Sequence, residues 1–401
     1  MSNSILTIDM ITAKALQIYE NNLVLTRNVD RQYDDSFANE GAKIGTTLRI
    51  RLPDRTLVTD GAALQVQDEN QQYTTLTVSS QKHIGVNFTT AEMTMQLDNF
   101  AELILKPRIS QLAASTDATV AQNAYKQIYQ SVGTPGTTPA TSLVLLQGNQ
   151  KLNESAAPMD QRYVTVNPAA NAGLVEGMKG LFNPVNTISK QFKSGYMGEG
   201  ILGYDEIAMS QSIPTHTTGD WGTGITVTST LSTEGTTSLG ISFTGSSKTW
   251  KAGDVFTIAG VYAVNPQTRQ STGSLQQFTV VSDVTGSSTA TLTVSPAIYT
   301  AANALATVDS FPQASAVVTM LGSANSTYAQ NLIYHKEAIA FATADLIMPR
   351  GVDMASRQNH NGISMRVVRQ YDINNDRMPC RVDVLFGSNV IRPSGACRLW
   401  G

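Results

Sequence analysis

Apolar side chains recur at helical spacing in two stretches of the chain, and these stretches predict two helices. Between residues 4 and 25, apolar positions from Ile8 to Ile18 follow one another at steps of three or four residues, as in an amphipathic helix. The stretch 90–130 keeps the same spacing and predicts a helix of about 40 residues. At 1.5 Å per residue it would be ~60 Å long, with a kink or a new start at Pro107.

A period of two begins near Gly45 and predicts a long β-hairpin. Leu48 and Ile50 alternate with polar residues until Pro53, and a similar alternation returns at 76–88. The stretch between the two is polar and contains an Asp-Gly pair, which is a turn signal. An extended arm of this kind needs a partner to cover its apolar side, so we expect it to lie over another protein surface.

The block 215–300 differs from the chain on both sides of it. Short strand-like runs (ITVTSTL, ISF, DVFTI, QFTVV, ATLTV) are separated by turn residues, and the block contains only seven Asp, Glu, Lys or Arg residues. Evenly spaced short strands predict a small all-β barrel or sandwich. Because the mixed pattern resumes after Pro312, we interpret the block as an insertion, and we expect Trp250, Phe256 and Ile258 in its core.

Composition narrows the classes of function. A chain of 401 residues predicts two or three domains, and 41% apolar with only 15% charged residues favours large interfaces or much β-structure. The net charge of −3 and the lack of Lys/Arg runs argue against a DNA-binding patch. The N-terminus has no signal-peptide pattern and no window reaches ~18 apolar residues, so we expect a product made in the cytoplasm, without membrane contact.

No pattern in the chain predicts catalysis, a cofactor or a metal. The segment GEGILG at 198–203 fits the G-x-G-x-x-G pattern of dinucleotide-binding proteins, but its polar surroundings favour a glycine-rich turn. The aspartates and asparagine at 372–376 begin like a calcium loop but lack its glycine and glutamate, so we predict a hairpin turn. The four histidines have no ligand spacing, and His335 is predicted to be structural. Cys380 and Cys397 are expected to be free thiols, although a disulfide between them is possible.

The order of these segments resembles the major capsid proteins of tailed double-stranded DNA bacteriophages, which have the Hong Kong 97 fold. It is more similar still to the coat-protein family of short-tailed Salmonella-type phages, whose members carry an inserted β-barrel. The resemblance covers essentially the whole chain and rests on the order of the segments more than on any one motif. The segments are TLRIRLP (47–53), AEMTMQLDNFAELILKPRISQLA (91–113), GYDEIAMSQSIPTHT (203–217), TGITV (223–227), KAGDVFTIAGV (251–261), NLIYHKEAIAFATADLIMP (331–349) and CRVDVLFGSNVIRPSGA (380–396).

The resemblance implies an α+β architecture with named parts. These are an N-terminal arm (1–40), an extended β-hairpin loop with flanking strands (41–89), the spine helix of a peripheral domain (90–132), a first part of an axial domain (133–217), the inserted β-barrel (218–312), an axial return (313–350), and peripheral strands with the C-terminal segment (351–401).

The function that the resemblance implies is that of a major capsid protein, assembled in the bacterial host cytoplasm and located in the virion. Its partners would be hundreds of copies of itself in hexamers and pentamers, a scaffolding protein, a portal protein at one vertex, and packaged DNA bound weakly. The expected contact residues on the extended loop are Arg55, Leu57, Val58, Leu64 and Val66.

The N-terminal arm offers a second candidate contact. Asp9 and Glu20 could meet a basic segment of a scaffolding protein, or they could simply form a solvated helix face. Members of the fold can crosslink through a loop lysine, but residues 53–72 contain none, so we predict a non-covalent shell. Two alternatives stay open at this point: a secreted β-rich adhesin, suggested by the Ser/Thr/Gly block, and a dehydrogenase-like enzyme built on GEGILG.

Overall fold

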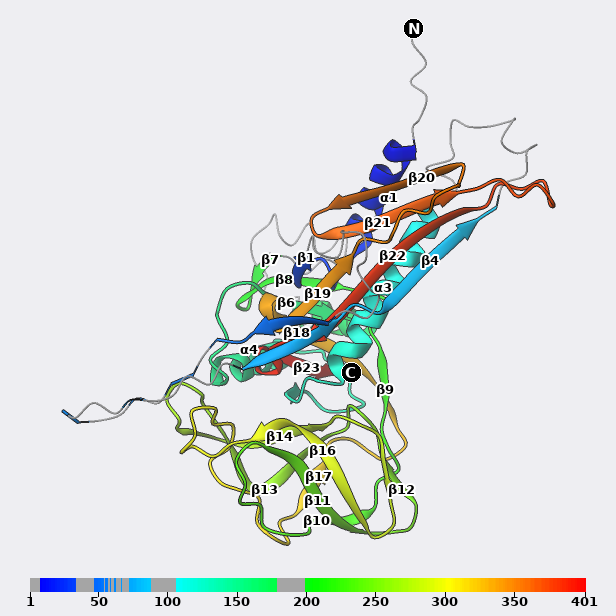
Figure 1. Ribbon diagram of the computed structural model, residues 1–401. Helices are drawn as coiled ribbons and strands as arrows, with labels where there is room; N and C mark the ends of the chain where they lie inside the picture. The colour runs from blue at the N-terminus through cyan, green and yellow to red at the C-terminus, as the bar shows by residue number, and fades with distance from the viewer. Residues whose placement is uncertain are drawn as a thin grey trace. The chain divides into compact units, whose positions relative to one another are not determined.

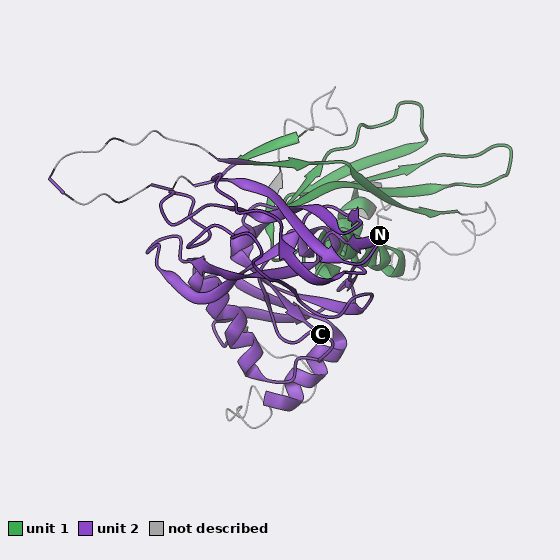
Figure 2. Cartoon of the chain, turned by 90° about the horizontal axis from the view of Figure 1, so that it is seen from below, with its two compact units in different colours: residues 1–50, 74–120, 340–389 green, residues 51–73, 121–339, 390–401 purple. Residues whose placement is uncertain are grey.

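The computed structural model describes residues 8–33, 47–53, 55–56, 58, 61–62, 66, 72–87, 106–178 and 199–401. The chain divides into two units, drawn in separate colours in Figure 2. Unit 1 contains Met1–Ile50, Thr74–Val120 and Ala340–Asn389, and unit 2 contains Arg51–Tyr73, Ala121–Ile339 and Val390–Gly401. Both helices and sheets are present, which confirms the mixed α+β class.

Unit 1 is built around a six-stranded sheet in the described residues, with strand order β1-β19-β22-β21-β20 and β4 also paired with β22. Its long strand β22 is mostly buried because β4 and β21 pair along it, with apolar Val382, Val384 and Phe386 on one face. The bounds are α1 Ile8–Asn22, β1 Asp30–Tyr33, β2 Thr47–Arg51, β3 Tyr73–Thr77, β4 Ser80–Val86, α3 Lys106–Tyr125, β19 Ile339–Ala344, β20 Met354–His360, β21 Ile363–Arg369 and β22 Cys380–Val390.

The two predicted helices are found with shorter limits. Helix α1 stops at Asn22 because a series of turns follows. Helix α3 begins at Lys106, so Pro107 lies in its first turn, where a missing N–H costs nothing. Its 20 residues correspond to about 30 Å, and the rest of the predicted 90–130 helix before Lys106 lies outside the described residues.

One unit 1 strand was not predicted. The segment DRQY was expected to be an extended arm or loop, but it forms β1, which pairs in parallel with β19 from Asp30↔Ala340 to Tyr33↔Thr343. The segment carries no apolar alternation because it is an edge strand, where main-chain hydrogen bonds rather than buried side chains fix the pairing.

Unit 2 contains a seven-stranded sheet in its described part, with order β5-β23-β18-β6-β8-β7 and β9 paired with β18. Helices α4 and α5 accompany it, and buried apolar residues such as Leu145, Leu174 and Ile333 join helices and sheet in one core. The bounds are β5 Ser131–Val132, α4 Ser142–Glu154, β6 Arg162–Val166, α5 Pro168–Met178, β7 Glu199–Ile201, β8 Tyr204–Met209, β9 Thr215–Thr217, β18 Thr327–His335, the 3₁₀ turns Lys336–Ala338 and Pro393–Gly395, and β23 Ala396–Trp400.

The block between β9 and β18 is all β-structure, drawn in green to yellow in Figure 1. Six of its described strands form one sheet in the order β10-β11-β16-β14-β13-β17, and β12 pairs with β15. We call this stretch the inserted block. Its bounds are β10 Thr223–Val227, β11 Thr236–Thr244, β12 Lys248–Trp250, β13 Val255–Val264, β14 Ser271–Val280, β15 Val284–Gly286, β16 Thr289–Ile298 and β17 Val318–Met320.

Three predicted segment limits differ from the structure. Strand β17 lies beyond 312 yet pairs with β13, so the six-stranded sheet of the inserted block continues past that limit; three residues are too few to show a period of two. Within the predicted segment 313–350, β18 lies in the unit 2 sheet and β19 in the unit 1 sheet. Within the predicted segment 351–401, β20, β21 and β22 lie in the unit 1 sheet, whereas β23 lies in the unit 2 sheet between β5 and β18. Pairing partners far apart in sequence decide these memberships, and no local pattern carries that information.

Candidate functional site

The loop 51–73 presents apolar side chains to solvent. Val58 is 91% exposed and Val66 is 84% exposed, the two highest values among the large apolar residues of the described part of the chain. Leu57 and Leu64, also predicted as contacts, lie outside the described residues. At the base of the loop its two ends are joined by a main-chain hydrogen bond, in which Leu52 N donates to Gln72 O at 2.9 Å. These two valines are therefore apolar surface that contact with another protein would remove from water.

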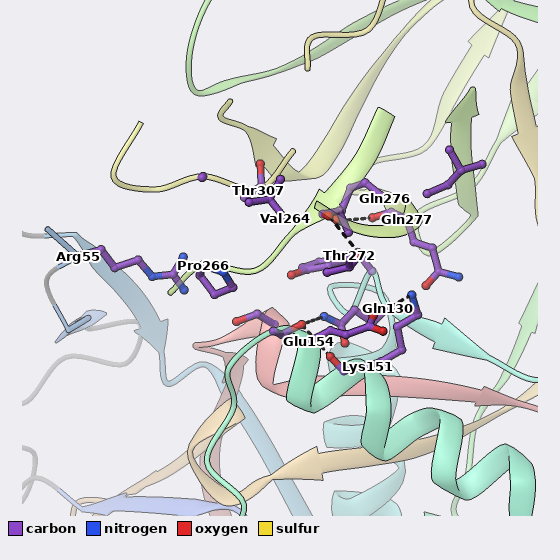
Figure 3. A pocket seen from close by; sticks show the side chains of 16 residues that line it. Arg55, Gln130, Lys151, Glu154, Val264, Pro266, Thr272, Gln276, Gln277 and Thr307 are labelled. Atoms are coloured by element: carbon purple, nitrogen blue, oxygen red, sulfur yellow. Dashed lines mark hydrogen bonds and ion pairs between the residues drawn. The ribbon is translucent and has the colours of Figure 1, made fainter. Parts of the chain in front are cut away.

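The base of the loop lies beside a polar pocket of unit 2 (Figure 3). Arg55 lines this pocket together with residues of α4, of the segment before β5, and of the inserted block. Inside it, Lys151 Nζ donates to Ser274 Oγ at 3.1 Å and lies 3.6 Å from Glu154 Oε2. The other lining residues are Tyr129, Gln130, Ser155, Ala263, Val264, Pro266, Thr272, Leu275, Gln276, Gln277, Ala306, Thr307 and Ser394.

The predicted core residues of the inserted block lie in one apolar cluster. Trp250, Phe256 and Ile258 are all fully buried there. The Trp250 ring meets Phe243 edge-on with centroids 4.6 Å apart, and Phe256 stacks on Phe278 at 5.7 Å. Aromatic pairs at these distances add to the free energy gained from burial itself.

A buried arginine joins the inserted block to the unit 2 sheet. Arg398, on β23, donates from Nε to Ile128 O at 2.7 Å, from Nη1 to Gly253 O at 2.7 Å and from Nη2 to Thr279 Oγ1 at 2.9 Å. Its guanidinium also lies 5.9 Å from the centroid of the Tyr125 ring. Burial lowers the pKa of Arg398 to about 10, while Tyr125 and Asp254 act to raise it, so the side chain stays charged at neutral pH.

A histidine–aspartate pair lies next to this arginine. His216, on β9, is 2.8 Å from Asp254 Oδ1 through its Nε2. Asp254 Oδ2 accepts from Trp221 Nε1 at 2.9 Å and from Lys251 N at 2.8 Å. Gly219 N also donates to Asp254 Oδ2, at 3.2 Å. His216 thereby links β9 to the inserted block, while the other donors lie within the block, and together they satisfy a fully buried carboxylate.

No pattern in the sequence marks Arg398 or Asp254 as a structural centre. Asp254 follows Ala-Gly in a stretch interpreted only as a turn, and Arg398 alternates with apolar neighbours in ACRLW. That alternation is the one signal available, and it would place Arg398 on the opposite face of a half-exposed strand. Strand β23 is buried on both faces, so the arginine finds its partners inside the protein.

The acidic residues predicted as scaffold contacts are engaged within unit 1. Ser356 Oγ donates to Asp9 Oδ1 at 2.5 Å. Glu20 Oε1 accepts from Arg31 Nη1 at 2.8 Å and from Asn361 Nδ2 at 2.9 Å. Burial would raise the pKa of Glu20, but the hydrogen bonds from Arg31 and Asn361 outweigh it and lower that pKa. Their role as scaffold contacts stays a prediction.

The motifs interpreted as structural have local explanations. The described part of GEGILG forms the turn between β7 and β8, with positive φ at Gly200, Leu202 and Gly203. Asp372 Oδ1 accepts from Asn374 N at 3.0 Å, which confirms the predicted hairpin turn. His335 is buried, and its Nδ1 accepts from Glu337 N at 3.3 Å.

Two further findings concern the thiols and the membrane. Cys380 and Cys397 are free and buried, as expected, and burial raises the pKa of Cys397 to about 12. Among the helices of the described residues, none has the length and the apolar content that crossing a bilayer would require.

Comparison with known proteins places the chain in a family. The family described as "P22 coat protein - gene protein 5" matches residues 1–401. The major capsid protein of Acyrthosiphon pisum secondary endosymbiont phage 1 is 22% identical over 399 residues, covering 94% of this chain and 93% of that protein. A Mycobacterium phage Che8 structure has a TM-score of 0.46 at 12% identity, covering 94% of this chain and 90% of that one. The mature capsid of bacteriophage PhiM1 has a TM-score of 0.43 at 11% identity, covering 94% and 86%. Because the family match spans the whole sequence, the chain belongs to the P22 coat protein family and is a major capsid protein of a bacteriophage.

Proposed function

We propose that this capsid protein builds the icosahedral shell of a tailed double-stranded DNA phage as hexamers and pentamers, with the loop 51–73 lying over a neighbouring copy. The observation that carries the proposal is the pair of exposed valines on this loop, Val58 and Val66. Covering them by a neighbour would remove apolar surface from water, at about 25 cal/mol for each Å² buried. That gain would offset the entropy lost when the loop becomes ordered against the neighbour.

The architecture that we propose is the Hong Kong 97 fold, with the inserted block as an accessory β-barrel. The unit 1 sheet with α3 would be its peripheral domain, and the unit 2 sheet with α4 and α5 its axial domain. The continuous core of the inserted block, which includes Trp250 and Phe256, supports a part that folds around its own side chains. Scaffolding and portal proteins are proposed as assembly partners, with DNA bound only weakly because 31 acidic residues exceed 28 basic ones.

The double variant Val58→Ser, Val66→Ser tests the loop contact. We expect the purified subunit to keep its melting temperature, because both side chains are exposed and contribute little to its own core. Assembly should suffer, with the yield of particles in sedimentation falling at least about tenfold, the effect of ~1.4 kcal/mol of contact energy per subunit.

Val317→Ser is the matched control, since Val317 is also exposed but lies on the inserted block. It should leave particle yield unchanged. Normal particles from the loop double variant would contradict the proposed role of the loop.

The shell should be held without covalent links between subunits. Residues 53–72 contain no lysine to form an isopeptide bond. Boiling assembled particles in detergent should therefore release a single band at the monomer mass of 43.0 kDa. A ladder of multiples on the gel would overturn this expectation.

A further inference from the structure

The turn between β13 and β14 approaches the base of the loop 51–73 within unit 2. Arg269, in this turn, donates from Nη2 to the main-chain oxygen of Thr56 at 3.2 Å. In the opposite direction, Arg55 extends toward Pro266 of the same turn, and both line the polar pocket (Figure 3). One arginine from each segment thus reaches the other segment.

The turn is held rigidly by its first residue. Asn265 Oδ1 accepts from Gln267 N at 2.9 Å and from Thr268 N at 3.1 Å, the pattern of an Asx-turn. The same side chain donates from Nδ2 to Glu154 O at 2.9 Å, which ties the turn to the end of α4. A main-chain hydrogen bond closes the turn, since Arg269 N donates to Asn265 O at 2.8 Å. These hydrogen bonds therefore hold the backbone of the turn that carries the Arg269 side chain.

The backbone of Arg269 is in a conformation that its residue type disfavours. Its φ is +57°, in the left-handed region that glycine and asparagine adopt most readily. A long side chain at such a position has to contribute something that the turn alone does not need. The contact with Thr56 O is a contribution that neither glycine nor asparagine can make, because neither is long enough.

We propose that Arg269 and Arg55 form a clamp by which the inserted block fixes the direction in which the loop 51–73 leaves unit 2. The clamp holds the loop base in the free subunit, so that less entropy is lost when the loop meets a neighbour. Arg269 is a positioning residue in this proposal. The consequence for assembly rests on the proposed function of the loop, whereas the clamp itself is a property of the isolated subunit.

Limited trypsin digestion of the full-length subunit tests the clamp. Cleavage after Arg55 requires the main chain at residues 55 and 56 to detach from Arg269 and enter the protease, so its rate follows the fraction of subunits in which the loop base is open. Arg269→Gly and Arg269→Asn both keep the left-handed turn and remove the guanidinium. We expect each to raise the rate of cleavage after Arg55 roughly five- to tenfold, the effect of losing one hydrogen bond of ordinary net strength at an exposed position. The melting temperature should not fall.

Two internal references make the result specific. Cleavage after Arg51, at the end of β2, should not change, because the clamp does not hold it. Ser247→Gly makes the same kind of replacement at a left-handed position, φ +53°, in another turn of the inserted block, and it should leave cleavage after Arg55 unchanged. Equal rates after Arg55 in the wild type and in both Arg269 variants would overturn the clamp.

Assembly separates this inference from the proposed function. If the Arg269 variants open the loop base while Val58→Ser, Val66→Ser assembles normally, the clamp stands and the proposed role of the loop fails. If the valine variant blocks assembly while cleavage after Arg55 is unaffected by Arg269→Gly, the role of the loop stands and the clamp fails.

Discussion

Replacing Arg398 by leucine should lower the free energy of unfolding of unit 2 by about 3–5 kcal/mol. The guanidinium is fully buried and satisfies Ile128 O, Gly253 O and Thr279 Oγ1 at once. Leucine would leave these acceptors without a donor, away from water, and would remove a positive charge that interacts with buried Asp254. Arg398→Lys should recover only part of the loss, because one ammonium cannot reproduce the planar fork of donors.

Tryptophan fluorescence during urea unfolding measures this loss, since Trp221, Trp250 and Trp400 all belong to unit 2. Arg377→Leu serves as the control, because Arg377 lies in an exposed turn and its loss should change stability by less than about 0.5 kcal/mol. A change below about 1 kcal/mol in Arg398→Leu would show that the buried hydrogen bonds do not stabilise the junction.

Replacing Asp117 by alanine should destabilise unit 1 by a similar amount, about 3–5 kcal/mol. This buried carboxylate on α3 accepts from Val24 N at 2.7 Å, Leu25 N at 3.3 Å and Thr26 N at 3.0 Å, and also from the Thr26 hydroxyl. Without it, three main-chain N–H groups just beyond α1 lose their acceptor. The hydrogen bond from Tyr19 Oη to Thr116 Oγ1 would be left to hold α1 to α3.

Hydrogen exchange of the amides at 24–26 and along α1 is the measurement, because these amides should exchange faster in Asp117→Ala. Asp117→Asn keeps one acceptor oxygen and should lose about half as much. Gln111→Ala, on an exposed position of the same helix, should leave exchange unchanged. Unaltered protection of 24–26 in the alanine variant would contradict the role assigned to Asp117.

Periodicity predicted much of the fold because many elements bury one face. The strand at 47–51, the helix containing Pro107 and five strands of the inserted block all lie where the pattern placed them. Short strands that pair with partners far away in the sequence were missed, as β1 and β17 show. The membership of β23 in the unit 2 sheet was also missed, because pairing between residues far apart in the sequence leaves no local trace.

Only the exposed apolar residues of the candidate site could be predicted from the sequence, and the buried charged residues could not. Val58 could be predicted as a contact residue because it is an apolar residue in a polar stretch. The burial of Arg398 and Asp117 could not be predicted, because a single charged residue in a sequence normally lies on the surface. Their burial depends on partners that the fold brings from elsewhere in the chain. Arg269 was also missed, since its left-handed backbone is a property of the folded turn.

The division of the chain has a genetic consequence. The chain passes from one unit to the other after residues 50, 73, 120, 339 and 389, so no continuous gene fragment encodes either unit. The inserted block, by contrast, is one uninterrupted stretch between β9 and β18. Two crossovers between related coat genes, one on each side of the block, would therefore exchange it whole, provided that the incoming sequence offers Arg398 a carbonyl and a hydroxyl where Gly253 and Thr279 now supply them.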